Sequence, residues 1–440
     1  MKNLLRFFTL ILILSNFYGC RKEDDNQPQP EYSDQVILAT PIITGENVSL
    51  TWSKMANQRF VEYMVLRRNY KSSGQITTSS IIAEISDAST TSYIDKNPPY
   101  TPYLEYQVIA VLLSNDPQVP ENIFSNIVPY ERPDIKVFRL GPADVIPDLD
   151  HNRLYVISGD SGKISILNTE TLTIEKSITT NASIGYGDLG ELSGIPEIYI
   201  PRNDGWVFIY DAETLEKKDQ INFGGTASSI IYNGGKLFIT GASSSGYYSY
   251  NIVAYDRITK NVLSTNTLYD NLRLKLVQNS NTFLFGVPVS SSYYNLSSLE
   301  FDSNGQLIEI LNHNSNHPLS ADIFRVFPAG QLMITGNKGN IFDKDLEYKI
   351  SLPYGSYEFS DFAINNSETI IYASSGNYKS VISYSYPDCS QIREYQTRGY
   401  PKYVFLRDNM LICLSRTTPI DYYPSYYPSD YILEKIPLTK

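Results

Sequence analysis

Short apolar runs separated by polar turns recur along most of the chain. Within many runs, apolar and polar side chains alternate. In Val48-Ser-Leu50-Thr-Trp52, for example, the three apolar side chains share one face of a strand. Runs of about four to eight residues bounded by turn residues predict β-strands. The 36 Tyr and 18 Phe, against 5 Met, point the same way because aromatic residues favour strands. The sequence therefore predicts an all-β protein.

Residues 35–131 contain turn residues about every 8–12 positions, which is typical of a β-sandwich. The order of motifs resembles a fibronectin type III domain: Trp52 in the second strand, Tyr63-x-Val65 in the third, then Thr91-Ser-Tyr93-x-Asp95 and Tyr106-x-Val108-x-Ala110. Tyr106 falls at the position of that family's tyrosine corner. The resemblance implies a sandwich that is stable without disulfides, and this stretch has no Cys. We favour a spacer role, with ligand binding as the alternative.

Residues 134–440 repeat one unit, in which a third strand closes with a polar turn that begins with Asn or Asp. These turn residues recur at intervals of 41 to 46 residues, at Asn168, Asp211, Asp256, Asp302, Asp343 and Asp388. That interval fits one four-stranded propeller blade. Seven second strands are recognisable as apolar runs: 153–157, 197–200, 236–239, 282–285, 331–334, 369–372 and 410–413.

The turns Asn168-Thr-Glu-Thr171-Leu and Asp211-Ala-Glu-Thr214-Leu resemble the strand–turn–strand signature of bacterial β-propellers of the YVTN and WD-like type. The resemblance implies a seven-bladed β-propeller after the fibronectin type III β-sandwich. The seventh unit lacks an outer strand, and an unassigned strand at residues 135–140 precedes the first unit. Pairing the two would remove an open edge, so we expect the ring to close at the C-terminal blade. An eight-bladed or open array is the alternative.

The first 19 residues are typical of a signal peptide, with Lys2 and Arg6 before an apolar run at 7–14 that is too short to span a bilayer. Gly19 directly before Cys20 resembles the lipobox of bacterial lipoproteins. The acidic stretch that follows resembles that of Bacteroidetes lipoproteins sent to the cell surface. The resemblance implies a lipid on Cys20 that anchors the protein in the bacterial outer membrane, exposed at the cell surface, with residues 20–34 as a tether. The alternative is an ordinary signal peptide followed by an incidental cysteine.

Composition argues against several classes of function. The net charge of −11 leaves no basic surface for nucleic acid. With 3 His and 3 Cys, the chain offers few metal ligands, and it contains no phosphate-binding glycine loop or nucleophile elbow. We therefore expect no metal, no cofactor, no catalytic residue and no enzymatic activity. Cys389 and Cys413 are expected to be free, mostly buried thiols, with a disulfide between them as the alternative.

Aromatic residues gather in the loops between second and third strands, which project to one face of a propeller. They are Trp206, Tyr247, Tyr248, Tyr250, Tyr293, Tyr294, Tyr378, Tyr422, Tyr423, Tyr426 and Tyr427. Rigid rings that carry hydroxyl groups suit the recognition of sugars and peptides at a small entropic cost. Alternatively, the rings only pack their own loops.

The sequence thus predicts a lipid-anchored cell-surface protein that presents this aromatic face to a glycan, a peptide or a partner protein. One alternative is a structural subunit of an envelope protein complex. Another is a glycan-active enzyme, which would gather carboxylates or arginines at the propeller axis.

Overall fold

The computed structural model describes residues 35–70, 76–96, 98–101, 103–114, 121–132, 135–243, 249–277, 282–289, 295–419 and 429–438. The chain divides into two compact units, Met1–Pro133 and Asp134–Lys440. Every regular element in the described ranges is a β-strand, so the protein is all-β, as the alternation of apolar and polar residues predicts.

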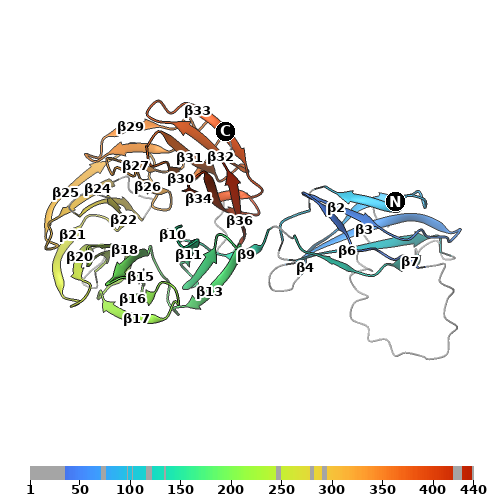
Figure 1. The fold of residues 1–440 in the computed structure, drawn as a ribbon, viewed down its shortest axis with the longest axis horizontal. Coiled ribbons are helices and arrows are strands. Elements are labelled where there is room, and N and C mark those ends of the chain that lie inside the picture. The colour runs from blue at the N-terminus through green and yellow to red at the C-terminus, as the bar shows by residue number, and fades with distance from the viewer. Residues whose placement is uncertain are drawn as a thin grey trace. The chain divides into compact units, whose positions relative to one another are not determined.

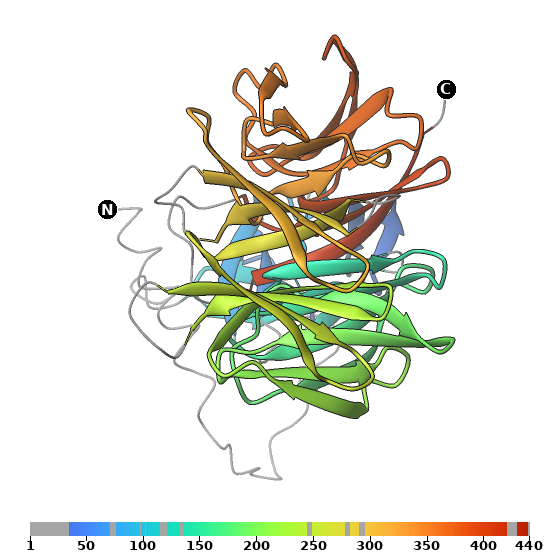
Figure 2. The ribbon, with the colours of Figure 1, turned by 90° about the vertical axis from the view of Figure 1, so that its left-hand side faces the viewer.

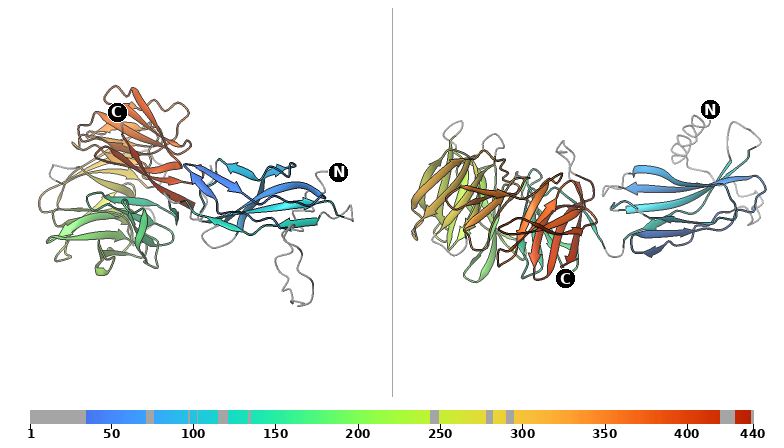
Figure 3. Two further views of the ribbon diagram at one scale, coloured as in Figure 1. Left: turned by 45° about the vertical axis from the view of Figure 1, so that its right-hand side comes forward. Right: turned by 90° about the horizontal axis from the view of Figure 1, so that it is seen from above.

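The N-terminal unit consists of two antiparallel sheets, which Figure 3 shows as separate layers. One sheet has the strand order β1-β2-β5. The other has the order β4-β3-β6-β7, and β8 also pairs with β6. The strands are β1 (Ile42–Thr44), β2 (Asn47–Thr51), β3 (Phe60–Tyr70), β4 (Ile76–Ile85), β5 (Ser92–Asp95), β6 (Tyr103–Leu112), β7 (Glu121–Phe124) and β8 (Val128–Tyr130).

One apolar cluster holds these two sheets together. The alternating residues Val48 and Leu50 of β2 are fully buried in it, with side chains from β3 and β6. Tyr106 of β6 donates its hydroxyl hydrogen bond to Oδ2 of Asp95 at 2.8 Å. Arg67 Nη1 lies 2.8 Å from the same oxygen. Because Asp95 belongs to β5, in the other sheet, this buried polar contact fixes one sheet against the other.

The C-terminal unit contains seven four-stranded antiparallel sheets among its described residues. We number them 1 to 7 along the chain. Sheets 1 to 3 are formed by β10 (Asp144–Asp148), β11 (Arg153–Ser158), β12 (Lys163–Asn168), β13 (Thr173–Thr179); β14 (Asp188–Leu192), β15 (Ile195–Pro201), β16 (Trp206–Asp211), β17 (Lys217–Asn222); and β18 (Thr226–Asn233), β19 (Lys236–Ala242), β20 (Tyr250–Asp256), β21 (Val262–Leu268).

Sheets 4 to 7 follow the same order of strands. They are formed by β22 (Leu272–Val277), β23 (Phe283–Pro288), β24 (Asn295–Phe301), β25 (Leu307–Asn314); β26 (Phe324–Val326), β27 (Leu332–Thr335), β28 (Asn340–Asp343), β29 (Tyr348–Ser351); β30 (Phe359–Ile364), β31 (Ile370–Ser375), β32 (Ser380–Ser385), β33 (Gln391–Gln396); and β34 (Tyr400–Arg407), β35 (Met410–Arg416), β36 (Ser429–Pro437), β9 (Val137–Leu140). Figure 1 shows the sheets around a common centre, with the labelled first strands inside and the labelled fourth strands of sheets 1 to 6 at the rim.

Sheet 7 combines strands from the two ends of this unit. β9 pairs antiparallel with β36, placing Phe138 opposite Tyr431 and Val137 opposite Ile432. Phe138 and Tyr431 are buried in a cluster that also contains Leu154 of sheet 1. Sheet 7 is therefore joined both to the first strand of the unit and to the neighbouring sheet 1.

The antiparallel order divides the loops of each sheet between two faces, and Figure 2 views the sheets from the rim. The second-to-third-strand loops and the connections between sheets lie on one face, which we call the pocket face. The first-to-second and third-to-fourth-strand turns lie on the other, which we call the turn face.

In sheets 1 to 5 an Asn or Asp that ends the third strand, or in sheet 4 directly follows it, builds an Asx turn each time. Its side-chain oxygen accepts hydrogen bonds from two backbone N–H groups two to four residues further on, at 2.7–3.1 Å. Such an Asx turn replaces backbone hydrogen bonds that the chain loses on reversing. A residue with positive φ completes each turn: Leu172, Leu215, Lys260, Gly305 and Leu346. The repeated residue in the sequence is thus a turn former.

Candidate functional site

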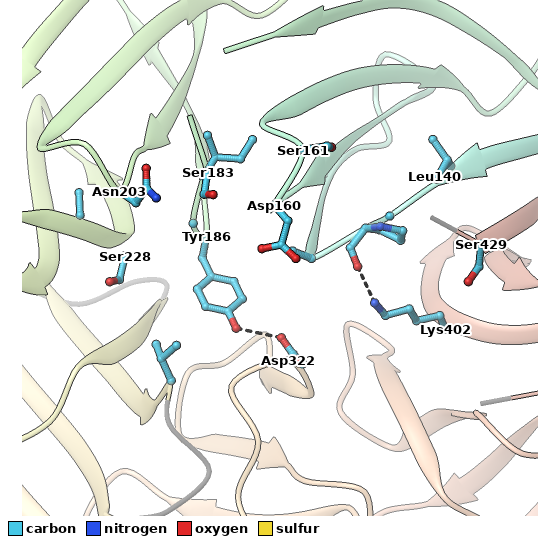
Figure 4. A pocket seen from close by; sticks show the side chains of 18 of the residues that line it. Leu140, Asp160, Ser161, Ser183, Tyr186, Asn203, Ser228, Asp322, Lys402 and Ser429 are labelled. Carbon is cyan, nitrogen blue, oxygen red and sulfur yellow. Dashed lines mark hydrogen bonds between the residues drawn. The ribbon is translucent and has the colours of Figure 1, made fainter. Parts of the chain in front are cut away.

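A cavity of about 590 Å³ opens on the pocket face of the C-terminal unit (Figure 4). We call it the axial pocket. Residues from every sheet except sheet 6, or from the connections that lead into those sheets, line it. Its charged side chains are Asp160, Asp322, Lys402 and Arg416, so both signs of charge are present. Its volume lies within the range of about 300–1,000 Å³ that is common for small-ligand sites.

An ion pair next to the axial pocket crosses the ring. Arg273, on β22 of sheet 4, places Nη2 2.6 Å from Oδ1 of Asp144, on β10 of sheet 1. The two side chains are 2% and 1% exposed. Arg273 also donates to the carbonyl oxygen of Ala321, and its guanidinium carbon lies 4.2 Å from the ring centre of Tyr186. Sheets 1 and 4 are not neighbours along the chain, so this pair links opposite parts of the ring.

Tyr186 forms a second contact across the pocket. Its hydroxyl donates to Oδ1 of Asp322 at 2.8 Å, as Figure 4 shows. The backbone N–H of Tyr186 donates to the carbonyl oxygen of Ser228 at 2.8 Å. A Cβ on the preceding Gly185 would lie 2.1 Å from that carbonyl oxygen, so only glycine permits this close approach. The tyrosine ring is thus held between the connection that leads into sheet 2 and the one that leads into sheet 5.

The alternation within β22 explains how charged residues reach the axis. Leu272 and Leu274 face the apolar cluster shared with sheet 3. Arg273 and Lys275 lie on the other face of the strand because successive side chains point to opposite sides. The charges that act on Lys275 come from four sheets, among them Arg273, Asp144 and Asp188. First strands of distant sheets therefore bring their charges together around one axis.

Burial shifts the pKa of several of these groups. Burial, with a smaller contribution from the positive charge of nearby Arg416, lowers the pKa of Lys402 to about 8. Burial likewise lowers the pKa of Lys275, and the positive charge of Arg273 lowers this pKa as well. It raises the pKa of the Asp188 carboxyl, although the backbone N–H of Tyr232 donates to that carboxyl at 2.8 Å. Amines and a carboxyl with such shifts exchange protons closer to neutral pH than exposed ones.

Sheet 7 supplies the cationic wall of the axial pocket. Lys402 Nζ donates to the carbonyl oxygen of Pro142, a bond drawn in Figure 4. Arg416 Nε donates to the hydroxyl of Tyr431 at 3.1 Å. The carboxylate of Asp160, in the β11–β12 loop, is exposed and has no hydrogen-bond or ion-pair partner in the described part of the chain. The pocket therefore offers fixed cations and an unengaged anion to a polar ligand.

A second cavity of about 460 Å³ lies beside the axial pocket, and we call it the Trp206 groove. Asn203 and Thr226 line both cavities. The Trp206 groove adds the side chains of Asp204, Trp206 and Asn222. Sequence reasoning selected Trp206 as a ligand-binding candidate, and the structure places it in this groove.

Two other aromatic candidates can be located. Tyr250 begins β20 and packs against the apolar cluster between sheets 3 and 4. Tyr378 is 43% exposed, but its ring lies 5.2 Å from that of Tyr357 and its hydroxyl donates to Ser356 Oγ at 3.2 Å. These contacts suit the loop-packing alternative. The remaining candidates, together with the lipidation residue, lie outside the described residues and stay predictions: Cys20, Tyr247, Tyr248, Tyr293, Tyr294, Tyr422, Tyr423, Tyr426 and Tyr427.

Sequence reasoning missed the charged residues of the axis. None of Asp160, Arg273, Asp322 and Lys402 was among its candidate site residues. A signal was present in β22, the first and innermost strand of sheet 4, where Leu272-Arg-Leu-Lys-Leu276 alternates apolar with charged residues. In an inner strand both faces are enclosed, so a charge there marks the axis rather than solvent.

No known protein family and no curated protein matches this sequence. Solved structures do match. The structure of U3-55K is 10% identical with a TM-score of 0.52, and the match covers 69% of this chain and 98% of that one. The WD40 repeats of RRP9 are 9% identical with a TM-score of 0.52, covering 70% and 98%. The class of fold in this chain is therefore a β-propeller like that of WD40 repeats.

The prediction that the chain is not an enzyme is wrong as stated, because structures similar to it include enzymes. Hydrazine synthase of Kuenenia stuttgartiensis is 13% identical with a TM-score of 0.49, covering 62% of this chain and 92% of that one. Dihydro-heme d1 dehydrogenase NirN is 12% identical with a TM-score of 0.44, covering 64% and 63%. At these scores neither structure assigns an activity to this chain, but the exclusion of catalysis is withdrawn.

Two kinds of feature are absent from the described residues. No helix there is long and apolar enough to cross a membrane. No group of three or more His, Cys, Asp or Glu in the same ranges is arranged to hold a metal ion.

Proposed function

We propose that the protein is a lipid-anchored cell-surface binding protein that takes up a ligand on the pocket face of its propeller. The observation that carries this proposal is the axial pocket, which combines Asp160, Lys402 and Arg416 with hydroxyl and amide side chains. Ligand sites on rigid scaffolds concentrate in loops, and the loops of the pocket face meet here. A glycan, a peptide or a segment of a partner protein offers matching polar groups.

The proposed anchor is a lipid on Cys20, which would hold the protein in the outer membrane of a bacterium. The residues around Cys20 support this address. Stable attachment requires two acyl chains or one chain with a second signal, since a single chain binds a membrane only reversibly. Expression of the full chain in a bacterial host, followed by membrane fractionation and mass spectrometry of the N-terminal peptide, tests the anchor. Cys20→Ala should release the protein from the membrane fraction. Retention of this variant would contradict the proposal.

We further propose that the N-terminal unit is a fibronectin type III spacer and that the C-terminal unit is a closed seven-bladed propeller. The division of strands into β1-β2-β5 and β4-β3-β6-β7 supports the spacer. The pairing of β9 with β36 supports the closed ring.

A specific observation favours catalysis as a second candidate function. Lys402 lines the axial pocket with a pKa of about 8, and burial raises the pKa of Asp188 beside the same axis. Groups with pKa values moved toward neutrality can act as general acids or bases. In this case the ligand would be a substrate that is converted in the axial pocket.

The experiment is a binding screen of the full-length chain in detergent against panels of glycans and peptides, with analysis of each bound compound for conversion. Asp160→Asn and Lys402→Met should each weaken binding about tenfold or more, which is the loss expected for one charged hydrogen bond. Asp345→Asn, an exposed carboxylate on the turn face, is the matched control and should bind normally. Binding that survives both pocket variants would overturn the proposal, and a converted ligand would establish the catalytic candidate.

A further inference from the structure

The axial pocket and the Trp206 groove adjoin each other. Asn203 and Thr226 line both of them, so a ligand that leaves the axial pocket over these two residues enters the groove. Each cavity lies within the size range of a site for one small ligand. A path of this kind suits a chain of linked units better than a single compact molecule.

Three glycines contribute backbone to the lining of the groove. Gly205, Gly224 and Gly225 line it, and the first two have φ values of 92° and 80°, which favour glycine. A Cβ on Gly205 would lie 3.5 Å from the carbonyl oxygen of Gly225, so a side chain there would occupy the space between the two loops. The glycines thus keep peptide groups accessible in the lining of the groove.

The chemistry of the groove is that of a sugar site. Among the described residues that line it, every side chain apart from Trp206 is polar or absent, and the polar ones include the amides of Asn203 and Asn222 and the carboxylate of Asp204. Asp204 is oriented by Arg202, whose Nε donates to Oδ1 at 2.9 Å and which is itself stacked over Phe208 at 3.9 Å. Amides and carboxylates bond to neighbouring hydroxyl groups, and an indole ring packs against the apolar face of a sugar.

A peptide fits this lining less well. Peptide recognition along a groove relies on apolar pockets for side chains or on an unpaired strand edge. Among the described residues the groove has one apolar side chain, Trp206, and the adjacent strands β16 and β17 are paired with each other through Trp206 and Asn222. The lining therefore favours a linear, neutral, hydroxyl-rich ligand.

We propose that the pocket face binds a linear oligosaccharide, whose end unit occupies the axial pocket and whose following units pass over Asn203 and Thr226 to stack on Trp206. This inference rests on the proposed binding function and specifies its ligand class. Two sites joined along one ligand raise affinity with ligand length, because binding at the second site becomes intramolecular.

The test is calorimetry of the full-length chain with chito-, cello-, malto-, manno- and xylo-oligosaccharides of one to six units. For the series that binds, the wild-type affinity should rise about tenfold or more between two and five units. Trp206→Ala should abolish this rise and leave the affinity for the shortest bound sugar unchanged. Asp160→Asn should weaken every length equally. Tyr269→Ala, a 77% exposed aromatic residue on the same face that lines neither cavity, is the matched control and should keep the rise.

The outcomes separate the two proposals. Sugar binding that does not increase with length, or an increase that survives in Trp206→Ala, overturns the extended site but leaves the binding function. Binding of a peptide in the axial pocket without any sugar binding likewise overturns the extended site but leaves the binding function. Failure of the wild type to bind any sugar or peptide overturns both proposals.

Discussion

The loops on the two faces of the propeller connect the same strands, but only the loops on one face repeat a common structure. On the turn face, sheets 1 to 5 repeat one device, the Asx turn that begins at residues such as Asp211 and Asp256. Among the described residues of the pocket face, no such device recurs. One connection supplies Tyr186, another Asp322, and the strand β34 supplies Lys402. Repetition thus specifies the fold, and departures from repetition build the site.

The difference also explains how far each face depends on distant parts of the chain. An Asx turn joins residues two to four positions apart, as in the bond from Thr214 N to Asp211. The ion pair of Arg273 and Asp144 joins residues 129 positions apart. A substitution on the turn face is therefore expected to disturb one turn, whereas a substitution at the axis is expected to lower the stability of the whole ring.

The largest effect is expected at the axis. Arg273→Met leaves the carboxylate of Asp144, which is 1% exposed, without its cation. We expect the free energy of unfolding to fall by about 3–5 kcal/mol, as for other broken buried ion pairs. Denaturant unfolding followed by circular dichroism measures this loss. The double variant Asp144→Leu with Arg273→Met removes both charges and should recover most of it. If the double variant is no more stable than the single one, the unpaired charge is not the cause.

A smaller effect is expected on the turn face. Asp211 accepts hydrogen bonds from the N–H groups of Glu213 and Thr214 and pairs with Lys218 at 2.7 Å. Asp211→Ala should lower the free energy of unfolding by about 1–2 kcal/mol and leave ligand binding unchanged. Asp345→Ala, an exposed carboxylate on the same face, should stay within about 0.5 kcal/mol of wild type. Equal losses in the two variants would refute a specific role for the turn.

The charge of Asp211 makes the turn face sensitive to acid. The hydrogen bond from Lys218, followed by those from Thr214, lowers the pKa of this carboxyl to about 2. In the unfolded chain the pKa is about 3.9, so ionised Asp211 stabilises the fold above about pH 4. That contribution disappears as the pH falls toward about 2. In unfolding experiments across this window, the stability advantage of wild type over Asp211→Asn should shrink. A constant advantage would contradict this assignment.

The smallest effect concerns the two cysteines. Both are free and buried, which confirms the expectation of two unpaired thiols. Cys389 lies in the β32–β33 turn on the turn face, and Cys413 lies inside β35. Burial raises both thiol pKa values, so little reactive thiolate forms. We expect a reducing agent to leave the melting temperature unchanged and both residues to be alkylated only after unfolding. Rapid labelling of Cys389 in the folded protein would show that its turn opens.

The sequence predicted the all-β class and the turn residues because each depends on neighbours along the chain. Alternation identified β2 from Val48, Leu50 and Trp52, and the recurrence of Asp211 and its equivalents marked the repeat. The residues of the axial pocket could not be found in this way. No neighbouring residue marks Asp160 as part of a pocket, and Arg273 had no visible partner until the ring brought it to Asp144. Contacts across a ring leave no periodic trace in the sequence.

The pairing of β9 with β36 also determines when the propeller can be completed during synthesis. β9 leaves the ribosome before any other strand of the propeller, and β36 leaves last. At a synthesis rate of about 5–20 residues per second, β9 waits roughly 15–60 s for its partner. During that interval β9 lacks the partner strand that it has in the finished ring, and the seventh sheet is incomplete. The finished ring therefore assembles only after its last segment has been made, whatever the speed at which the other six sheets form.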